Sequence, residues 1–276
     1  MKLSIITINY NDATGLQKTL NSTFTQSCTD FEHVIVDGAS PDNSVAVIEK
    51  YATEASAKGI KVIWISEKDK GIYNAMNKGI KMASGEYCEF LNSGDMLASN
   101  DVVKTMYDYL EKNEYPDIMY GNMRKVLPNG KILHDSCYAT HDVTLNMFYK
   151  GCLNHSPAYI RRSLFEKYGL YDETLKICSD WKFYMQSIVL GKAQVKYVNY
   201  LVTIFDMNGI SETRKDILNE ERDRLLQELV PAGILKDYHK YHFPMSQYDR
   251  LKRYRIWPIV YFVERVLFKL EKWHIL

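Results

Sequence analysis

Short apolar segments alternate with longer amphipathic segments in the first part of this chain, and this alternation constrains the fold more than any other feature. The apolar segments have the length of strands and occupy residues 3–8, 33–36, 61–65 and 86–91. The segments between them predict helices at residues 14–25, 44–57 and 72–83. Strands that alternate with helices of this length form β-α-β units. The sequence therefore predicts an α/β fold with a Rossmann-like, mixed but mostly parallel sheet flanked by helices.

The bulk composition is that of a globular protein without a charge bias. The chain has 276 residues, of which 46% are hydrophobic and 25% charged, and its formal net charge is +1. A net charge this small does not favour a nucleic-acid partner. The five cysteines are scattered without a CxxC pair, which favours a reducing compartment over a disulfide framework or a zinc site. No signal peptide is expected, and no apolar stretch reaches the ~18 residues of a spanning helix.

Acidic residues follow three of the predicted strands within turns. Asp37 follows the second strand, Asp69 the third, and Asp95 the fourth. The carboxyl ends of parallel strands meet at one edge of a sheet, where α/β folds bind their ligands. Each aspartate alone could equally cap a turn or a helix. Three carboxylates at one edge indicate a site for a metal ion or a nucleoside.

Several segments, in order and spacing, resemble the family 2 glycosyltransferases of the GT-A fold over about residues 1–215. They are Ser4–Asn11, Val34–Ser40, Asp69–Gly79, Ala83–Asp95, His155–Phe165, Asp180–Trp181 and Asn208–Ser211. The resemblance implies a bacterial polysaccharide-type enzyme. Such an enzyme transfers a sugar, with inversion, from a nucleotide diphosphate donor to an acceptor hydroxyl in cell-surface glycan biosynthesis. UDP is the favoured nucleotide, with GDP and dTDP open. The particular sugar, the acceptor and its linkage stay undetermined.

The residues that match the family's nucleotide-sugar site are Tyr10, Asp37, Asp69, Gly71, Asn92, Asp95 and His155. The resemblance implies that Tyr10 lies near the base and that Asp37 accepts a hydrogen bond from the base edge. It implies that Asp69 contacts the nucleoside and that Gly71 permits a close backbone approach. His155 either touches the diphosphate or the acceptor, or is a structural histidine.

Asp95 matches the last acidic residue of the family's DxD motif, which holds Mg²⁺ or Mn²⁺. The chain departs from that motif, because Asn92 and Gly94 replace acidic residues common in relatives. We therefore expect one protein carboxylate on the metal, with the donor diphosphate and water as the other ligands, an arrangement that suits Mg²⁺. Asp180 matches the family's catalytic base, and it also occupies a position where it could cap a helix.

Two other functions remain open at this point. A non-catalytic nucleotide-sugar-binding or glycan-binding protein of the same fold is one, motivated by the missing acidic residues at 92 and 94. A nucleotidyltransferase is the other, but such enzymes carry a Gly-rich basic loop after the first strand, where this chain has Asn9–Asp12.

The last part of the chain changes character. Basic residues alternate with apolar ones between residues 250 and 273, and Trp257 and Trp273 stand at the two ends of this segment. This is typical of a helix that lies in a membrane interface. We expect a catalytic domain at residues 1–215 and a helical extension at 216–276. The extension binds either the membrane surface or a second copy in a homodimer. The expected location is the cytoplasm, at the inner face of the cytoplasmic membrane, with a glycan or lipid-linked acceptor.

Overall fold

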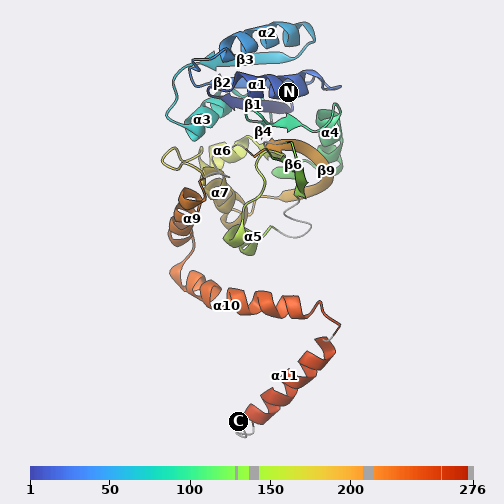
Figure 1. Cartoon of the computed structure of the whole chain (residues 1–276), viewed down its shortest axis with the longest axis vertical. Coiled ribbons are helices and arrows are strands. Elements are labelled where there is room, and N and C mark those ends of the chain that lie inside the picture. Colours follow the sequence, from blue (N-terminus) through green and yellow to red (C-terminus); the bar gives the residue numbers. More distant parts are fainter. Residues whose placement is uncertain (128–129, 137–142, 208–213, 256, 273–276) are drawn as a thin grey trace. The chain divides into compact units, whose positions relative to one another are not determined.

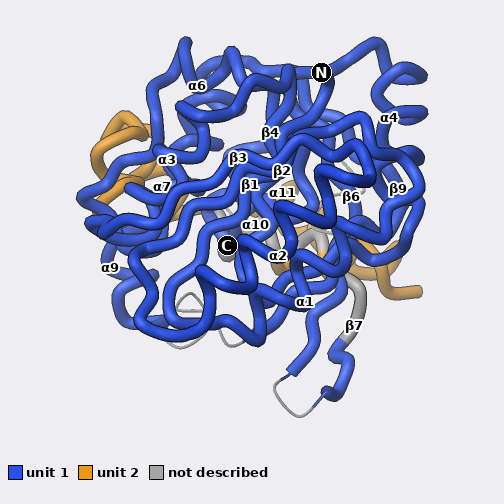
Figure 2. Tube along the Cα trace, turned by 90° about the horizontal axis from the view of Figure 1, so that it is seen from above, with its two compact units in different colours: residues 1–223 blue, residues 224–276 orange. Residues whose placement is uncertain are grey.

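The computed structural model describes residues 1–127, 130–136, 143–207, 214–255 and 257–272 (Figure 1). The motif Asn208–Ser211 lies outside the described residues. The chain divides into two compact units, residues 1–223 and 224–276 (Figure 2). The division falls inside one helix, α9 (Lys215–Leu229).

The N-terminal half of unit 1 is a parallel sheet built from β-α-β units. Its strands run in the order β3-β2-β1-β4, and each neighbouring pair is parallel. The strands are β1 (Leu3–Asn9), β2 (Phe31–Asp37), β3 (Lys61–Ser66) and β4 (Tyr87–Phe90). The helices between them are α1 (Ala13–Phe24), α2 (Ser44–Ala57) and α3 (Ile72–Met82). The predicted alternation is confirmed, with small differences at the element ends.

Helices cover both faces of this sheet, which explains why every residue of β1 and β2 is buried. On one face, Leu16 of α1 and Ile48 of α2 join Leu3 and Phe31 in a single apolar core. On the other face α3 approaches β1 closely. A Cβ atom added at Gly79 would lie 2.4 Å from Ile6, so a glycine permits this contact.

The second half of unit 1 continues the sheet with mixed strand directions. The order continues from β4 as β8-β6-β9-β5, with β7 paired to β6. These strands are β5 (Met96–Leu97), β6 (Ile118–Val126), β7 (Ile132–Ser136), β8 (Ala158–Arg161) and β9 (Val195–Asp206). The apolar segments at residues 195–198 and 201–205 belong to one long strand, β9. The register between β6 and β9 shifts twice near Gly121, so the bulge rather than a chain break interrupts the apolar pattern.

The second half of unit 1 also contains several short helices. They are α4 (Val102–Lys112), α5 (Leu145–Lys150), α6 (Ser163–Tyr168), α7 (Ser179–Tyr184) and the π-helix η1 (Met185–Leu190). The helical segment at residues 179–190 is therefore an α-helix, α7, that continues directly as the π-helix η1. The indole of Trp181 donates to the carbonyls of Phe148 and Gly151, both at 3.0 Å. This contact fixes α7 against α5.

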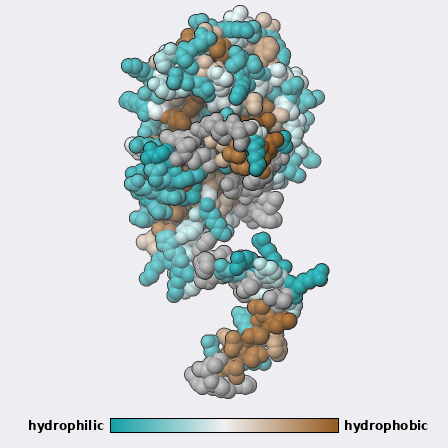
Figure 3. Space-filling model, viewed as in Figure 1, coloured by the Kyte–Doolittle hydropathy of each residue, from teal (hydrophilic) through white to brown (hydrophobic). Residues whose placement is uncertain are grey.

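Unit 2 contains the end of α9 with α10 (Ala232–Leu251) and α11 (Trp257–Lys272). No side chain of α11 is buried, and its apolar residues form the brown surface over this helix in Figure 3. Across the described residues, every helix is too short or too polar to cross a membrane.

Candidate active site

A cavity of about 1180 Å³ opens beyond the carboxyl ends of β1 and β4, where the fold is expected to bind a ligand. Its wall includes all but one of the residues predicted for the site. They are Tyr10, Asp69, Gly71, Asn92, Asp95, His155 and Asp180. The structure therefore brings together residues that lie up to 170 positions apart in sequence, from Tyr10 to Asp180.

Asp37 is the one residue predicted for the site that does not line the cavity. Its side chain is fully buried. Four donors occupy its carboxylate: the backbone N–H and hydroxyl of Ser40, the hydroxyl of Ser66 and the amide of Asn9, at 2.5 to 2.9 Å. Burial favours a higher pKa for Asp37, but these hydrogen bonds outweigh it and keep the pKa below its ordinary value. A nucleobase would have to displace one of the four donors to reach this carboxylate.

Tyr10, Asp69 and Gly71 form one end of the cavity. A Cβ atom added at Gly38 would lie 2.7 Å from the Asp69 carboxylate and 3.1 Å from the Tyr10 ring, so both side chains converge over this glycine. The Tyr10 side chain is 68% exposed, which leaves its ring available for stacking. Gly71 has a φ of +124° and its N–H donates to Asp69 at 2.9 Å. Only glycine adopts this backbone readily.

Helix α1 holds the turn that presents Asp95. The hydroxyl of Thr19 donates to the carbonyl of Asp95 at 2.7 Å and accepts from the N–H of Gly94 at 3.0 Å. Asp12 caps α1 through the N–H of Gly15 and also accepts from Ser93 at 3.0 Å. Gly94 has a φ of +93°. The position where relatives carry an acidic residue therefore has a backbone conformation that favours glycine here.

The Asp95 carboxylate is only 4% exposed and has a second carboxylate, that of Asp206, in its electrostatic environment. Burial raises the pKa of Asp95 well above its ordinary value. The N–H of Asp206, 3.2 Å from Oδ1, opposes this effect, and the negative charge of Asp206 adds to it. The amide oxygen of Asn92, also on the cavity wall, is buried without a hydrogen-bond partner.

These oxygen atoms are the ligands that Mg²⁺ or Mn²⁺ prefers, and a cation would relieve the repulsion between the carboxylates. The residues present therefore fit a divalent cation. Within the described part of the chain, however, no group of three or more His, Cys, Asp or Glu side chains converges as a complete metal site. Ligands from a substrate would have to complete the coordination.

Asp180 lies in the first turn of α7 on the cavity wall. The Tyr73 hydroxyl is 3.2 Å from its Oδ1 and also donates to the carbonyl of Ile177. Burial raises the pKa of Asp180 from 3.8 to about 6, while the N–H of Trp181, Tyr73 and the charge of Arg222 oppose this rise. A carboxylate with a pKa near 6 is well matched to general-base work near neutral pH.

Glu221 of α9 holds the turn that precedes Asp180. Its carboxylate accepts the N–H groups of Lys176, Ile177 and Cys178 at 2.7, 3.0 and 3.0 Å. The side chain is 8% exposed. Charge-assisted hydrogen bonds to buried amides are strong, so Glu221 fixes the backbone that carries the catalytic candidate.

His155 stacks on Phe90 with ring centroids 4.7 Å apart, and its Nε2 lies 2.7 Å from the Tyr171 hydroxyl. Burial lowers its pKa to about 3. The imidazole is therefore neutral at physiological pH and provides no positive charge for a diphosphate. The sequence left open whether His155 touches a substrate or is a structural histidine. These contacts favour the structural role, in which His155 supports the cavity wall.

Sequence reasoning missed four residues that shape this site: Tyr73, Asp206, Glu221 and Arg222. Asp206 directly follows the apolar segment at residues 201–205 and ends β9, so the strand-end rule applied to Asp37, Asp69 and Asp95 would have found it. Glu221 and Arg222 lie in a highly charged helix, whose pattern is typical of a solvated face.

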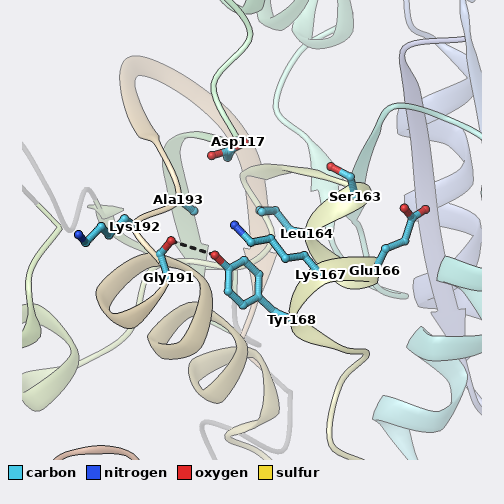
Figure 4. A pocket seen from close by; sticks show the side chains of 9 residues that line it. All are labelled: Asp117, Ser163, Leu164, Glu166, Lys167, Tyr168, Gly191, Lys192 and Ala193. Carbon is cyan, nitrogen blue, oxygen red and sulfur yellow. Dashed lines mark hydrogen bonds between the residues drawn. The ribbon is translucent and has the colours of Figure 1, made fainter.

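A second, smaller hollow of about 460 Å³ lies between α6 and the end of the π-helix (Figure 4). Lys167 and Tyr168 line one side, Lys192 the other, and the Tyr168 hydroxyl bridges the gap to the carbonyl of Gly191 at 2.9 Å. None of the predicted catalytic or binding residues lines it. The large cavity is therefore the candidate active site.

Comparison with known proteins agrees with this geometry. Residues 4–177 match the model of the family described as glycosyl transferase family 2. A PGL/p-HBAD biosynthesis glycosyltransferase of Mycobacterium bovis is 27% identical over 214 residues, which cover 77% of this chain and 80% of the relative. An uncharacterized glycosyltransferase of Mycobacterium tuberculosis is 28% identical over 217 residues, with 77% of this chain and 78% of the relative covered.

Solved structures share the fold. TarS 1–349 of S. aureus in complex with UDP aligns with a TM-score of 0.62 and 23% identity over 83% of this chain and 71% of that one. The match covers 43% of the longer TarS chain. The mannosyltransferase PcManGT from Pyrobaculum calidifontis, in complex with GDP-Man and Mn²⁺, aligns with a TM-score of 0.56 and 16% identity, covering 74% of this chain and 56% of that one.

The family model covers more than half of the chain, and the solved structures share its fold with TM-scores of 0.62 and 0.56. The chain belongs to glycosyl transferase family 2 and has the GT-A fold. The family and the fold class predicted from the sequence are confirmed.

Proposed function

We propose that this glycosyltransferase moves a sugar from a nucleotide diphosphate sugar, with inversion, to an acceptor hydroxyl in the assembly of a cell-surface glycan. One observation carries the proposal: a carboxylate with a pKa near 6, Asp180, shares a cavity with the Asp95 and Asp206 pair. The first group suits removal of a proton from an acceptor, and the second suits a cation that neutralises a diphosphate.

Each of these residues has its own role in the proposed reaction. Asp180 accepts the proton of the acceptor hydroxyl as its oxygen bonds to the anomeric carbon, while the bond from that carbon to the diphosphate oxygen breaks. Tyr73 and Glu221 orient Asp180. Asp95 would hold Mg²⁺ or Mn²⁺ together with Asp206 and the amide oxygen of Asn92, and the bound ion would stabilise negative charge on the leaving diphosphate.

A UDP-sugar is the proposed donor. Tyr10 and Asp69 would contact the nucleoside, and the open space at the Cα of Gly71 would permit close approach of the backbone. The UDP complex of TarS and the GDP-Man complex of PcManGT support a nucleotide-sugar donor and leave the nucleotide to experiment. Thermal-shift measurements with UDP-, GDP- and dTDP-sugars, with and without Mn²⁺, would rank the donors, because a ligand stabilises the state it binds.

Hydrolysis of the donor tests the proposal without knowledge of the acceptor. We expect slow, Mn²⁺-stimulated release of the sugar from at least one nucleotide sugar, and loss of this activity in Asp180→Asn. Binding of a nucleotide sugar without turnover by the wild type would instead identify a non-catalytic binding protein.

We also propose that α11 holds the enzyme on an anionic membrane surface, where a lipid-linked or growing glycan acceptor would be reached. Ile259, Val263, Val266 and Leu270 share one face of this helix at ~100° per residue. Arg265 and Lys272 lie on the other side of the helix, and Lys269 lies about 90° from the centre of the apolar face. An apolar face with basic residues on the remaining surface suits anionic lipid headgroups.

Flotation with vesicles that contain anionic lipid tests this second proposal. Val266→Glu places a charge in the apolar face and should reduce binding. Phe268→Glu introduces the same charge on about the opposite side of the helix and serves as the matched control. Equal binding by both variants would reject the membrane role, and loss of a dimer in Val266→Glu alone would assign the face to a second copy of the chain.

A further inference from the structure

Arg222 of α9 is a cation on the cavity wall that the reaction described above does not use. Its Nε atom is buried without a hydrogen-bond partner. Other arginines of unit 1 form ion pairs: Arg161 with Glu86, Arg162 with Glu166 and Arg214 with Asp216. Burial of a guanidinium donor without a partner is costly. The side chain is therefore arranged for a group that the protein itself does not supply.

Arg222 lies on the side of the cavity that holds the catalytic base, because its neighbour Glu221 binds the N–H of Cys178, two residues before Asp180. Burial raises the pKa of Asp180, Cys152 and Cys178, and the positive charge of Arg222 acts in the opposite direction on all three. The charge that acts on Asp95 is that of Asp206, and Arg222 does not contribute there. Arg222 is thus close to the base, whereas Asp206 is the charged side chain that acts on Asp95.

The position of Arg222 is fixed by its neighbour in sequence. Glu221 binds three N–H groups of the turn that leads to Asp180, and this turn also carries Lys176, which lines the cavity together with Lys150. Arg222, Lys150 and Lys176 therefore line the same cavity as Asp180 and give it positive charge.

In an inverting displacement the attacking hydroxyl and the leaving diphosphate lie on opposite sides of the anomeric carbon. Groups beside the base therefore contact the acceptor, and groups beside Asp95 contact the diphosphate. Arginine presents a planar set of donors that matches the oxygen atoms of a phosphate or a carboxylate. We propose that Arg222 binds an oxyanion of the acceptor, so that the substrate class is a glycan or glycan precursor carrying phosphate or carboxylate groups. This inference rests on the proposed transfer reaction.

Isothermal titration with inorganic phosphate and with glycerol 1-phosphate tests the site directly, with glycerol as the uncharged control. Each titration is done on the full chain, once alone and once with the donor site saturated by UDP and Mg²⁺. We expect both anions to bind in both conditions and glycerol not to bind. Arg222→Gln should weaken the binding about 10- to 100-fold, the loss expected for a charge-assisted hydrogen bond.

Two further variants separate charge from fold. Arg222→Lys keeps the positive charge and should bind phosphate with intermediate affinity. Arg224→Gln removes a positive charge from the exposed side of the same helix and should bind phosphate as the wild type does.

Phosphate binding that disappears when UDP is present would assign Arg222 to the donor diphosphate and overturn the acceptor inference. Absent phosphate binding in the wild type, or equal binding by wild type and Arg222→Gln, would overturn the oxyanion site altogether. Failure of every nucleotide tested to bind would count against the proposed donor chemistry, and the titrations without nucleotide would still decide whether Arg222 is an anion site.

Discussion

Replacement of Asp180 by asparagine should slow sugar transfer by orders of magnitude and at the same time stabilise the folded protein above neutral pH. The wild-type pKa is raised from 3.8 to about 6 by burial. The base works only when deprotonated, so kcat/KM for the wild type should rise with pH and level off above an apparent pKa of about 6. The substitution should lower this rate about 10²–10⁴-fold, the usual contribution of a general base.

The stabilisation follows from the same pKa. Because the native state binds the Asp180 proton more tightly than the unfolded state, this group favours folding most below about pH 4 and loses that contribution as the pH rises through about 6. Each pKa unit corresponds to about 1.4 kcal/mol, so the charged carboxylate costs the native state at most about 3 kcal/mol. Partial contact with solvent in the cavity reduces this to about 1–3 kcal/mol.

Urea unfolding of the wild type and Asp180→Asn at pH 4.5 and pH 8 measures the difference. The variant should be the more stable protein at pH 8, with a smaller advantage at pH 4.5. Asp223→Asn, an exposed aspartate on α9, serves as the control and should show no such pH-dependent gain. A wild-type rate that is flat between pH 5 and 7.5, or a variant no more stable than wild type at pH 8, would refute Asp180 as a buried base.

Three other substitutions probe the surroundings of the site. Asp95→Asn should remove the stimulation of UDP binding by Mn²⁺ in calorimetry, and retained stimulation would exclude Asp95 as a metal ligand. Glu221→Gln should lower kcat about tenfold or more with an unchanged Kd for UDP, because the Asp180 turn loses a charged acceptor; a change confined to UDP affinity would contradict this role. Gly94→Ala should destabilise the protein by about 1–2 kcal/mol in urea unfolding because of its positive φ, and an unchanged stability would show that the turn relaxes.

The fold could be predicted from the sequence because local sequence patterns specify the strands and helices of its first half. The strand β1 is mostly apolar and β2 contains the apolar run Val34–Val36, and turn residues follow both. The short elements β5, β7 and α5 have no pattern of their own, because contacts from distant residues, such as the bond from Trp181 to Phe148, decide their structure. A bulge opposite Gly121 interrupts the apolar pattern of β9, so its sequence does not indicate one continuous strand.

Part of the site could also be predicted from the sequence, because local signals mark the ends of the strands. Strand-end position placed Asp69 and Asp95 on the cavity wall, whereas the role of Asp37 depends on Ser40 and Ser66, whose hydroxyl groups occupy its carboxylate. No local sequence pattern indicates that these hydroxyl groups donate hydrogen bonds to Asp37. The hydrogen bonds between Glu221 and the turn before Asp180 join residues more than 40 positions apart. The sequence of a highly charged helix does not indicate such contacts.

The contact of Glu221 also sets the length of the smallest fragment that can be active. A protein ended at residue 177, where the family match stops, or at residue 215 would lack this carboxylate. Three N–H groups beside the base would then lose their acceptor, at a cost of about 1–3 kcal/mol for each that stays buried. A minimal catalytic fragment must therefore extend at least through Asp223, and any truncation that tests the membrane helix should begin well beyond that point.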